Sequence, residues 1–144
     1  LAQELNLPVI VHERDAHSDA MAILDEFPEV TGVFHCYSGS AEMAKEVVKL
    51  GMYIGLGGAV TFKNARKPLE VAASVPADKL LIETDCPYMT PVPFRGKRND
   101  SGYIPYAAEV IAAARGVTAQ EILDLTRKNA EILFGVEVKN VFSR

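Results

Sequence analysis

The sequence predicts an α/β fold with parallel strands. Four short apolar runs lack the polar alternation of half-exposed strands, and they cover residues 7–11, 30–34, 52–56 and 80–82. Runs of this kind are typical of strands buried on both faces of a parallel sheet. Segments with helical spacing separate them, and strand–helix alternation favours right-handed crossovers. The order predicts either a small open sheet or half of a (β/α)₈ barrel, since a whole barrel needs about 250 residues.

The helices between the strands are marked by apolar stripes and stop signals. The first helix is marked by the stripe Met21, Leu24 and Phe27, and the second by the stripe Met43, Val47 and Leu50, which Gly51 closes. A third, weaker helix is predicted over residues 65–73. Glycine is common directly after a helix because it adopts the left-handed backbone without strain. These stripes predict helices that pack one face against the sheet.

Helices are also predicted at both ends of the chain. Residues 1–5 read as the end of a helix with Asn6 as its stop, so we expect further residues to precede them. Near the other end, Pro105 suits the first turn of a helix that Gly116 closes. Thr118 and Glu121 have the spacing of a capping box for a last helix.

Composition excludes some classes of protein. The 144 residues are 49% hydrophobic and 24% charged, and no apolar run approaches the about 20 residues that cross a bilayer. The net charge of −4 argues against a general grip on nucleic-acid phosphate, but not against a nuclease with metals and local cations. The two cysteines form no disulfide framework, which favours a reducing, cytoplasmic compartment.

Polar side chains follow three of the predicted strands. His12 follows residues 9–11, His35 follows residues 33–34, and Asp85 lies just beyond residues 80–82. The carboxyl ends of parallel strands share one edge, where functional groups gather. Imidazole with carboxylate suits Zn²⁺, Mn²⁺ or Mg²⁺, and such ions acidify water and neutralise phosphoryl charge. The pattern predicts a metal site of His12, His35 and Asp85.

Each of these residues also has a structural interpretation. A histidine at a strand end is often a hydrogen-bonded structural residue, and Asp85 suits a turn that leads into Pro87. His17, which opens a helix, is interpreted as a solvated surface residue. Adjacent residues of an extended chain point to opposite sides, so Cys36 should not share an ion with His35. Cys36 and Cys86 are interpreted as buried thiols.

A long irregular segment, residues 86–102, carries a cluster of cations. Arg95, Lys97 and Arg98 fall within four residues and are candidates for phosphate contacts, with a solvated loop tip as the alternative. Arg14 either reaches the same mouth or pairs with Asp15.

Together these residues resemble the TatD family of metal-dependent deoxyribonucleases, over essentially the whole chain. The matching segments are residues 8–16, 34–40, 83–88 and 91–99. The resemblance implies a TIM-type barrel with two divalent metal ions (Mg²⁺, Mn²⁺ or Zn²⁺) and DNA as substrate. It implies that His12 and His35 bind one metal. Asp85 would bind the other and orient or deprotonate the attacking water. Substrate would be positioned by Arg14, Arg95, Lys97 and Arg98.

The chain also departs from the family pattern. The family's His-x-His pair after the first strand and its metal-bridging mid-barrel Glu have no counterpart in this sequence, and Asp100-Ser101 stands where Glu-Pro is usual. The resemblance therefore implies that residues 1–144 are one domain, the C-terminal half of the barrel with strands five to eight and without the N-terminal half. We expect this chain alone to be inactive. Its open edge strands favour self-association or pairing with an N-terminal half.

The leading hypothesis is a metal-dependent hydrolase of phosphodiester bonds, a 3′-directed deoxyribonuclease. One alternative keeps the metals and changes the bond, as in a related amidohydrolase acting on amides or esters. Another is a non-catalytic half-barrel that binds a partner chain to complete its sheet, or a small open α/β binding domain.

Overall fold

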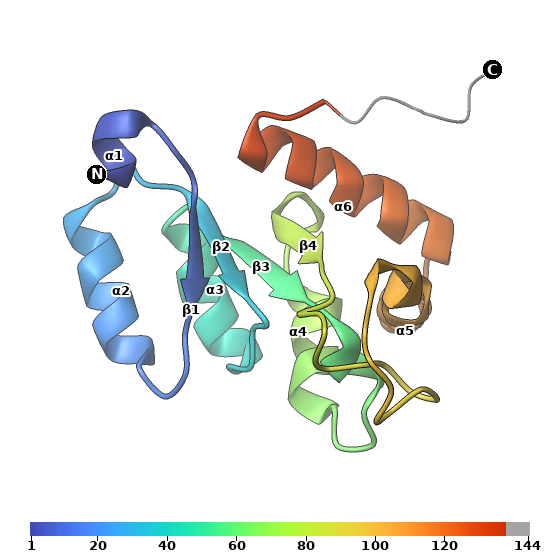
Figure 1. Ribbon diagram of the computed structural model, residues 1–144. Helices are drawn as coiled ribbons and strands as arrows, with labels where there is room; N and C mark the ends of the chain where they lie inside the picture. The colour runs from blue at the N-terminus through green and yellow to red at the C-terminus, as the bar shows by residue number, and fades with distance from the viewer. Residues whose placement is uncertain (138–144) are drawn as a thin grey trace.

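The computed structural model describes residues 1–137 and contains one sheet of four parallel strands in the order β1-β2-β3-β4 (Figure 1). The strands are β1 (Val9–His12), β2 (Gly32–His35), β3 (Tyr53–Leu56) and β4 (Leu80–Ile82). The predicted α/β class with parallel strands is confirmed. Residues 138–144 of the predicted domain lie outside the described residues.

The helices follow the predicted stripes and stops. They are α1 (Ala2–Leu5), α2 (His17–Glu26), α3 (Ala41–Lys49), α4 (Arg66–Ser74), α5 (Ile104–Arg115) and α6 (Ala119–Phe134). Three short 3₁₀ turns are η1 (Gly58–Thr61), η2 (Ala77–Lys79) and η3 (Ser101–Tyr103). Within the described residues, no helix has the length and apolar character to cross a bilayer.

The predicted helix ends are confirmed. Asn6 closes α1 and Gly116 closes α5, both in the left-handed conformation with φ of 51° and 68°. The capping box that opens α6 is present. The backbone N–H of Glu121 donates to Thr118 Oγ1 at 3.2 Å, and that of Thr118 donates to Glu121 Oε2 at 2.7 Å. These contacts satisfy N–H groups that a helix start otherwise leaves free.

Helices cover one face of the sheet. Phe34, Ile54 and Leu80 are fully buried in the main core, which also includes Val47 of α3 and Val71 of α4. Figure 1 shows α3 and α4 behind the sheet and α2 beside β1. Because neighbouring strand residues point to opposite faces, positions next to these core residues, such as His35, face the other side.

The last helix anchors the β4 edge. Asn129 of α6 is buried, and its side-chain amide donates to the carbonyl oxygens of Ala77 and Leu80 at 2.8 Å each. A buried amide with both donors satisfied fixes α6 against this edge.

Burial on both faces holds for β2 and β3 but was wrong for β1. Along β1 the residues alternate between partly buried and exposed, and Ile10 is 65% exposed. The reason is position: β1 pairs only with β2 in the described sheet, and the face that carries Ile10 is left open. An apolar, unpaired edge strand of this kind can pair with another chain. The expected self-association or pairing with an N-terminal half stays a prediction.

Candidate metal centre

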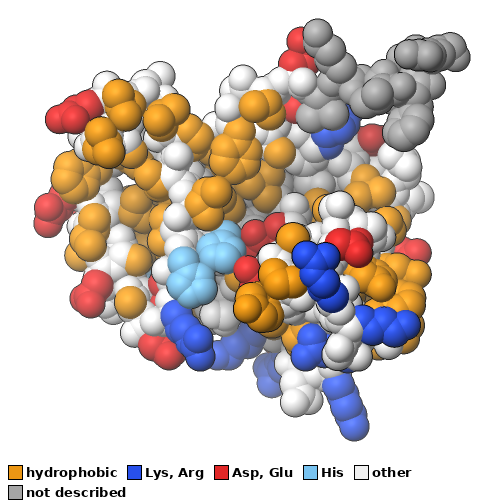
Figure 2. All heavy atoms as spheres, in the orientation of Figure 1, with side chains coloured by type: hydrophobic (Ala, Val, Ile, Leu, Met, Phe, Trp, Pro, Cys, Tyr) orange, Lys and Arg blue, Asp and Glu red, His pale blue; other side chains and the backbone are white. Residues whose placement is uncertain are grey.

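Two strand-end histidines lie side by side. His12 and His35 are register partners at the ends of β1 and β2, and His12 Nδ1 is 2.8 Å from His35 Nε2. His12 is exposed and His35 is partly buried. Figure 2 shows the pale-blue imidazoles on one open face, with red carboxylates beside them and blue Lys and Arg below. The parallel register therefore places two imidazole nitrogens next to one another at the surface.

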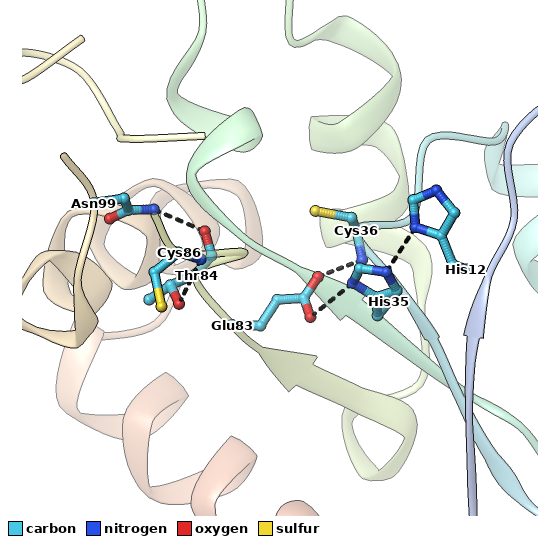
Figure 3. Close-up of polar contacts among 7 residues, drawn as sticks. All are labelled: His12, His35, Cys36, Glu83, Thr84, Cys86 and Asn99. Carbon is cyan, nitrogen blue, oxygen red and sulfur yellow. Dashed lines mark hydrogen bonds and ion pairs between the residues drawn. The ribbon is translucent and has the colours of Figure 1, made fainter. Parts of the chain in front are cut away.

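A carboxylate absent from the predicted site, Glu83, orients His35. Glu83 Oε2 lies 3.6 Å from His35 Nδ1, and Glu83 Oε1 accepts a hydrogen bond from the backbone N–H of Cys36 (Figure 3). A carboxylate at one ring nitrogen favours the proton there and leaves the other nitrogen as the electron-pair donor. For His35 that donor is Nε2, the atom beside His12.

Two glycines, one in β3 and one directly after it, leave the space that Glu83 occupies. A Cβ at Gly55 would lie 3.3 Å from both Glu83 Cδ and His35 Cα, and one at Gly57 would lie 3.0 Å from the Glu83 carbonyl oxygen. A larger residue at position 55 would therefore press on both partners. The β3 backbone passes under the site without filling it.

Asp85, which follows β4, lies close to the residues at the end of β2. One ligand atom each from His35, Cys36 and Asp85 lies within 4.8 Å of the others. Imidazole nitrogen, thiol sulfur and carboxylate oxygen are donors that a divalent transition metal accepts. The convergence of His12 with His35, and of His35 with Asp85, is thus present in the structure.

The expectation that Cys36 turns away from His35 was wrong. Cys36 has φ of 48°, and Asp85 has φ of 53°, so neither continues an extended strand. In the left-handed conformation the alternation of side chains no longer holds. Burial of both thiols was also wrong, because Cys36 is partly buried and Cys86 is exposed.

The surroundings of the Cys36 thiol are negatively charged. Burial and the nearby carboxylates of Glu83 and Asp85 raise the pKa of its thiol to about 12. Without a cation the thiol is therefore protonated at neutral pH. A bound cation would reverse this preference, because metal coordination deprotonates a thiol.

The interpretation of His17 as a solvated residue was also wrong. It is partly buried, and its ring centroid lies 6.5 Å from that of Phe34. His17 opens α2, and its ring packs towards the core rather than into solvent.

The predicted cationic residues are exposed, but two of them brace the loop. Arg95 donates to the Thr90 carbonyl oxygen at 3.0 Å and stacks 3.9 Å from the centre of the Phe62 ring. Lys97 lies 5.5 Å from the Phe94 ring centre. Arg98 and Arg14 are exposed. Of the loop cations, Arg98 is the least committed to loop structure.

Asn99 fixes the loop beside the cluster. It is 1% exposed, and its side-chain amide donates to the carbonyl oxygens of Thr84 and Tyr88 at 2.7 and 2.6 Å (Figure 3). Asp100, which replaces the usual Glu, accepts from the N–H of Gly102 at 2.8 Å. The loop therefore returns to Asp85 without the Glu-Pro pair.

Glu83→Gln is expected to weaken metal binding by the chain about 10-fold, because partners that orient ligating histidines contribute 10- to 100-fold. Glutamine keeps an acceptor for the Cys36 N–H but loses the charge at His35. Competition between the chain and a fluorescent zinc chelator measures this affinity. Glu46→Gln, which removes only the exposed pair with Lys49, is the control. Equal affinities of the two variants would exclude the orienting role.

A parallel α/β fold that brings imidazoles and carboxylates to the carboxyl edge of its sheet is the arrangement expected of a metal-dependent hydrolase. The sequence matches the family described as TatD related DNase over residues 1–135, and the chain belongs to this family. It is 52% identical to the uncharacterized metal-dependent hydrolase YabD of Bacillus subtilis, over 94% of this chain and 54% of that protein.

Other relatives extend the likeness to an exonuclease and to a solved structure. The 3′-5′ ssDNA/RNA exonuclease TatD of Citrobacter rodentium is 37% identical over 97% of this chain and 56% of its own length. The crystal structure of YJJV, a TatD homolog from Escherichia coli K12, superimposes with a TM-score of 0.87 at 34% identity, covering 94% of this chain and 53% of that one. The chain spans about half the length of the curated relatives it matches.

Proposed function

We propose that the chain supplies part of the active site of a metal-dependent phosphodiester hydrolase, a 3′-directed deoxyribonuclease. In this proposal residues 1–144 are one domain that corresponds to strands five to eight of a TIM-type barrel. The observation that carries it is the 2.8 Å approach of His12 to His35 at the edge where Asp85 also lies. The name of the Citrobacter rodentium relative supports nucleic acid as the substrate class.

The donor set fits a divalent metal ion, which the name of the Bacillus subtilis relative supports. His12 and His35 would bind one ion and Asp85 the other, with Mg²⁺, Mn²⁺ or Zn²⁺ as candidates. When bound, such ions supply an acidified water and offset charge on the phosphoryl group.

The chain's own residues would perform the remaining steps. The Asp85 carboxylate accepts the proton of the attacking water, and Glu83 keeps His35 in the tautomer that presents Nε2. Arg98 and Arg14 contact the phosphates of a single strand. Arg95 and Lys97 shape the loop through Phe62 and Phe94, and contribute charge rather than direct positioning.

The cationic loop favours phosphodiesters over the amide or ester substrates of a related amidohydrolase. A hollow of about 540 Å³ lies between Tyr88 and Arg98 and is lined by loop cations. Tyr88 is 71% exposed. An exposed aromatic ring beside cations is a platform on which a base of single-stranded DNA stacks. Neutral amides and esters gain nothing from this charge.

One observation favours a partner-dependent role for the isolated chain. The open β1 edge, with Ile10 65% exposed, offers a parallel strand and an apolar face to another chain. The 144 residues also lack the His-x-His pair and the bridging Glu that the family resemblance implies. We therefore expect little or no cleavage by this chain alone.

The test is a hybrid enzyme. Residues 1–137 replace the matching segment of the Citrobacter rodentium exonuclease, and the hybrid is assayed on 3′-labelled single-stranded DNA with Mg²⁺, Mn²⁺ or Zn²⁺. Chelator-sensitive cleavage by a folded hybrid is expected, with no turnover of cyclic amides or esters. A folded hybrid that leaves DNA intact while hydrolysing an amide or ester would overturn the phosphodiesterase assignment. Chelator-sensitive cleavage by the 144-residue chain alone would contradict its expected inactivity.

Arg98→Ala is expected to weaken binding of single-stranded DNA by the chain and to reduce the slope of log affinity against log salt by about 0.7. One lost phosphate contact on a single strand has this effect. Fluorescence anisotropy across a salt series measures it. Lys49→Ala is the matched control, since Lys49 lies at the end of α3 that leads into β3, away from the carboxyl ends of the strands. An Arg98 variant with the slope of the control would remove Arg98 from the phosphate contacts.

A further inference from the structure

We propose that residues 57–69 and 86–99 form one cationic surface, which binds the part of a single-stranded nucleic acid that continues beyond the metal centre. This inference rests on the proposed function, which brings the 3′ end of the nucleic acid to the metal centre. It adds Lys63, Arg66 and Lys67 to the substrate contacts.

Positive charge is concentrated in these two segments. They contain no Asp or Glu and six of the 15 Lys and Arg residues, in a chain whose net charge is −4. The six cations are exposed, and they are Lys63, Arg66, Lys67, Arg95, Lys97 and Arg98. Blue side chains accordingly gather below the imidazoles in Figure 2. Such a cluster on an otherwise acidic chain raises the local concentration of an anionic ligand.

The two segments are in contact although they are distant in the sequence. The Arg95 guanidinium lies 3.9 Å from the centre of the Phe62 ring, and the Val92 N–H donates to Thr61 Oγ1 at 2.8 Å. These contacts hold the loop against the residues directly before Lys63. The cations before and at the start of α4 therefore share a surface with those of the loop.

This cationic surface reaches the edge of the sheet that carries the metal centre. Lys67 lines a hollow of about 510 Å³ together with residues that follow β1 and β2, among them Glu13 and Ser38. The loop cations line the hollow beside Tyr88, which follows Asp85 by three residues. A nucleic acid that ends at the metal centre can therefore continue over both segments.

Carboxylates limit where phosphates can lie. Arg66 is paired with Glu70 at 2.9 Å. Within the described residues, no ion pair joins Lys63 or Lys67 to a carboxylate. The hollow that Lys67 lines is also lined by the carboxylates of Glu13, Asp15 and Asp19. Because these carboxylates repel phosphate, the nucleic acid is expected to pass over Lys63 and Lys67 without entering the hollow.

An exposed aromatic ring favours nucleic acid over an acidic peptide. Tyr88 is 71% exposed and lines the same hollow as Arg95 and Arg98. Surfaces that bind single-stranded nucleic acid combine cations along the backbone with aromatic rings on which bases stack. An acidic peptide would pair with the cations but has no base to stack on Tyr88.

A double variant, Lys63→Ala with Lys67→Ala, tests the cationic surface. Fluorescence anisotropy of the 144-residue chain is measured with a chelator present, on a trinucleotide and on single-stranded DNA of about 12 nucleotides, within the range of single-strand site sizes. For the longer DNA we expect the slope of log affinity against log salt to fall by about 1.4, at about 0.7 for each lost phosphate contact. Trinucleotide binding is expected to be unchanged. Lys49→Ala with Lys128→Ala is the matched control, because it removes the same charge from α3 and α6.

A readout on the unmodified chain guards against misfolding of the variant. The longer DNA at about ten times its Kd should slow acetylation of Lys63 and Lys67 about 10-fold, because only the free chain reacts there. Lys49 and Lys128 should react at an unchanged rate, as followed by peptide mass spectrometry.

Several results would overturn the cationic surface. They are a slope equal to that of the control, an equal loss on the trinucleotide, no binding of the longer DNA, or no protection of Lys63 and Lys67. Equal affinity for polyglutamate of the same charge would overturn the assignment to nucleic acid. Because no cleavage is measured, the hybrid assay decides the hydrolase proposal separately.

Discussion

Replacing Asp85 with asparagine is expected to lower the rate of DNA cleavage by the hybrid at least about 1000-fold, within the range of proton-transfer catalysis. Asparagine has nearly the same shape but cannot accept the proton of the attacking water. It also removes one negative charge from the group formed with His35 and Cys36. The initial rate on 3′-labelled single-stranded DNA measures the loss.

A control on the same loop separates catalysis from loop structure. Asp100 accepts a hydrogen bond from the Gly102 N–H, and an asparagine oxygen can do the same. Asp100→Asn should therefore retain cleavage within about 2-fold, since surface changes of this kind have small effects. Both variants should unfold at the temperature of the parent hybrid. Full activity of a folded Asp85→Asn hybrid would remove Asp85 from the mechanism.

The strand-end histidines were predictable because one simple rule governs them. Parallel strands end at the same edge, so side chains that directly follow two neighbouring strands must meet, as His12 and His35 do at 2.8 Å. The helix ends were predictable for a similar reason. Gly116, Asn6 and the Thr118–Glu121 pair each act locally, through backbone conformation or a hydrogen bond to the next turn.

Glu83 was missed although a local signal for it exists. It directly follows β4, and the alternation that buries Leu81 on one face carries Glu83 to that same face, towards His35. Glu83 was overlooked because Asp85, in the turn that follows, was taken as the carboxylate ligand of this strand end. Gly55 adds a second signal, visible only in three dimensions, because its missing side chain matters only once β4 lies beside β3.

The errors at Cys36 and β1 have different physical causes. The backbone at Cys36 leaves the extended conformation after the strand. A cysteine, unlike glycine, does not indicate a left-handed φ in the sequence. The exposure of β1 depends on what neighbours it, which the apolar run Val9–Val11 cannot report. Apolar runs predict that a strand is suited to burial, and only the assembly decides whether burial occurs.

Gly58→Ala is expected to destabilise the chain by about 3 kcal/mol, the upper part of the usual range for overpacking. Gly58 is buried at the start of η1, and a Cβ there would lie 2.0 Å from the Met89 carbonyl oxygen and 3.1 Å from Pro91 N. Backbone atoms cannot rotate away as a flexible side chain does. The segment around Met89 must therefore move away from η1.

This displacement should reach the metal centre. The Val92 N–H donates to Thr61 Oγ1 at 2.8 Å, so η1 is the surface on which the loop after Asp85 is seated. We expect zinc affinity of Gly58→Ala to fall together with its stability in urea. Gly96→Ala is the control: its Cβ would contact nothing within 4 Å, and only its φ of 84° is unfavourable, at about 1 kcal/mol.

The two variants separate two effects: Gly58→Ala disturbs the contact between η1 and the loop after Asp85, whereas Gly96→Ala adds only backbone strain. If seating positions Asp85, Gly58→Ala weakens zinc binding at temperatures where the chain is still folded, while Gly96→Ala binds zinc as the parent chain does. If both variants bind zinc normally when folded, the loop after Asp85 does not depend on η1. Asp85 would then be positioned by contacts within its own loop, such as the hydrogen bonds that Asn99 donates to Thr84 and Tyr88.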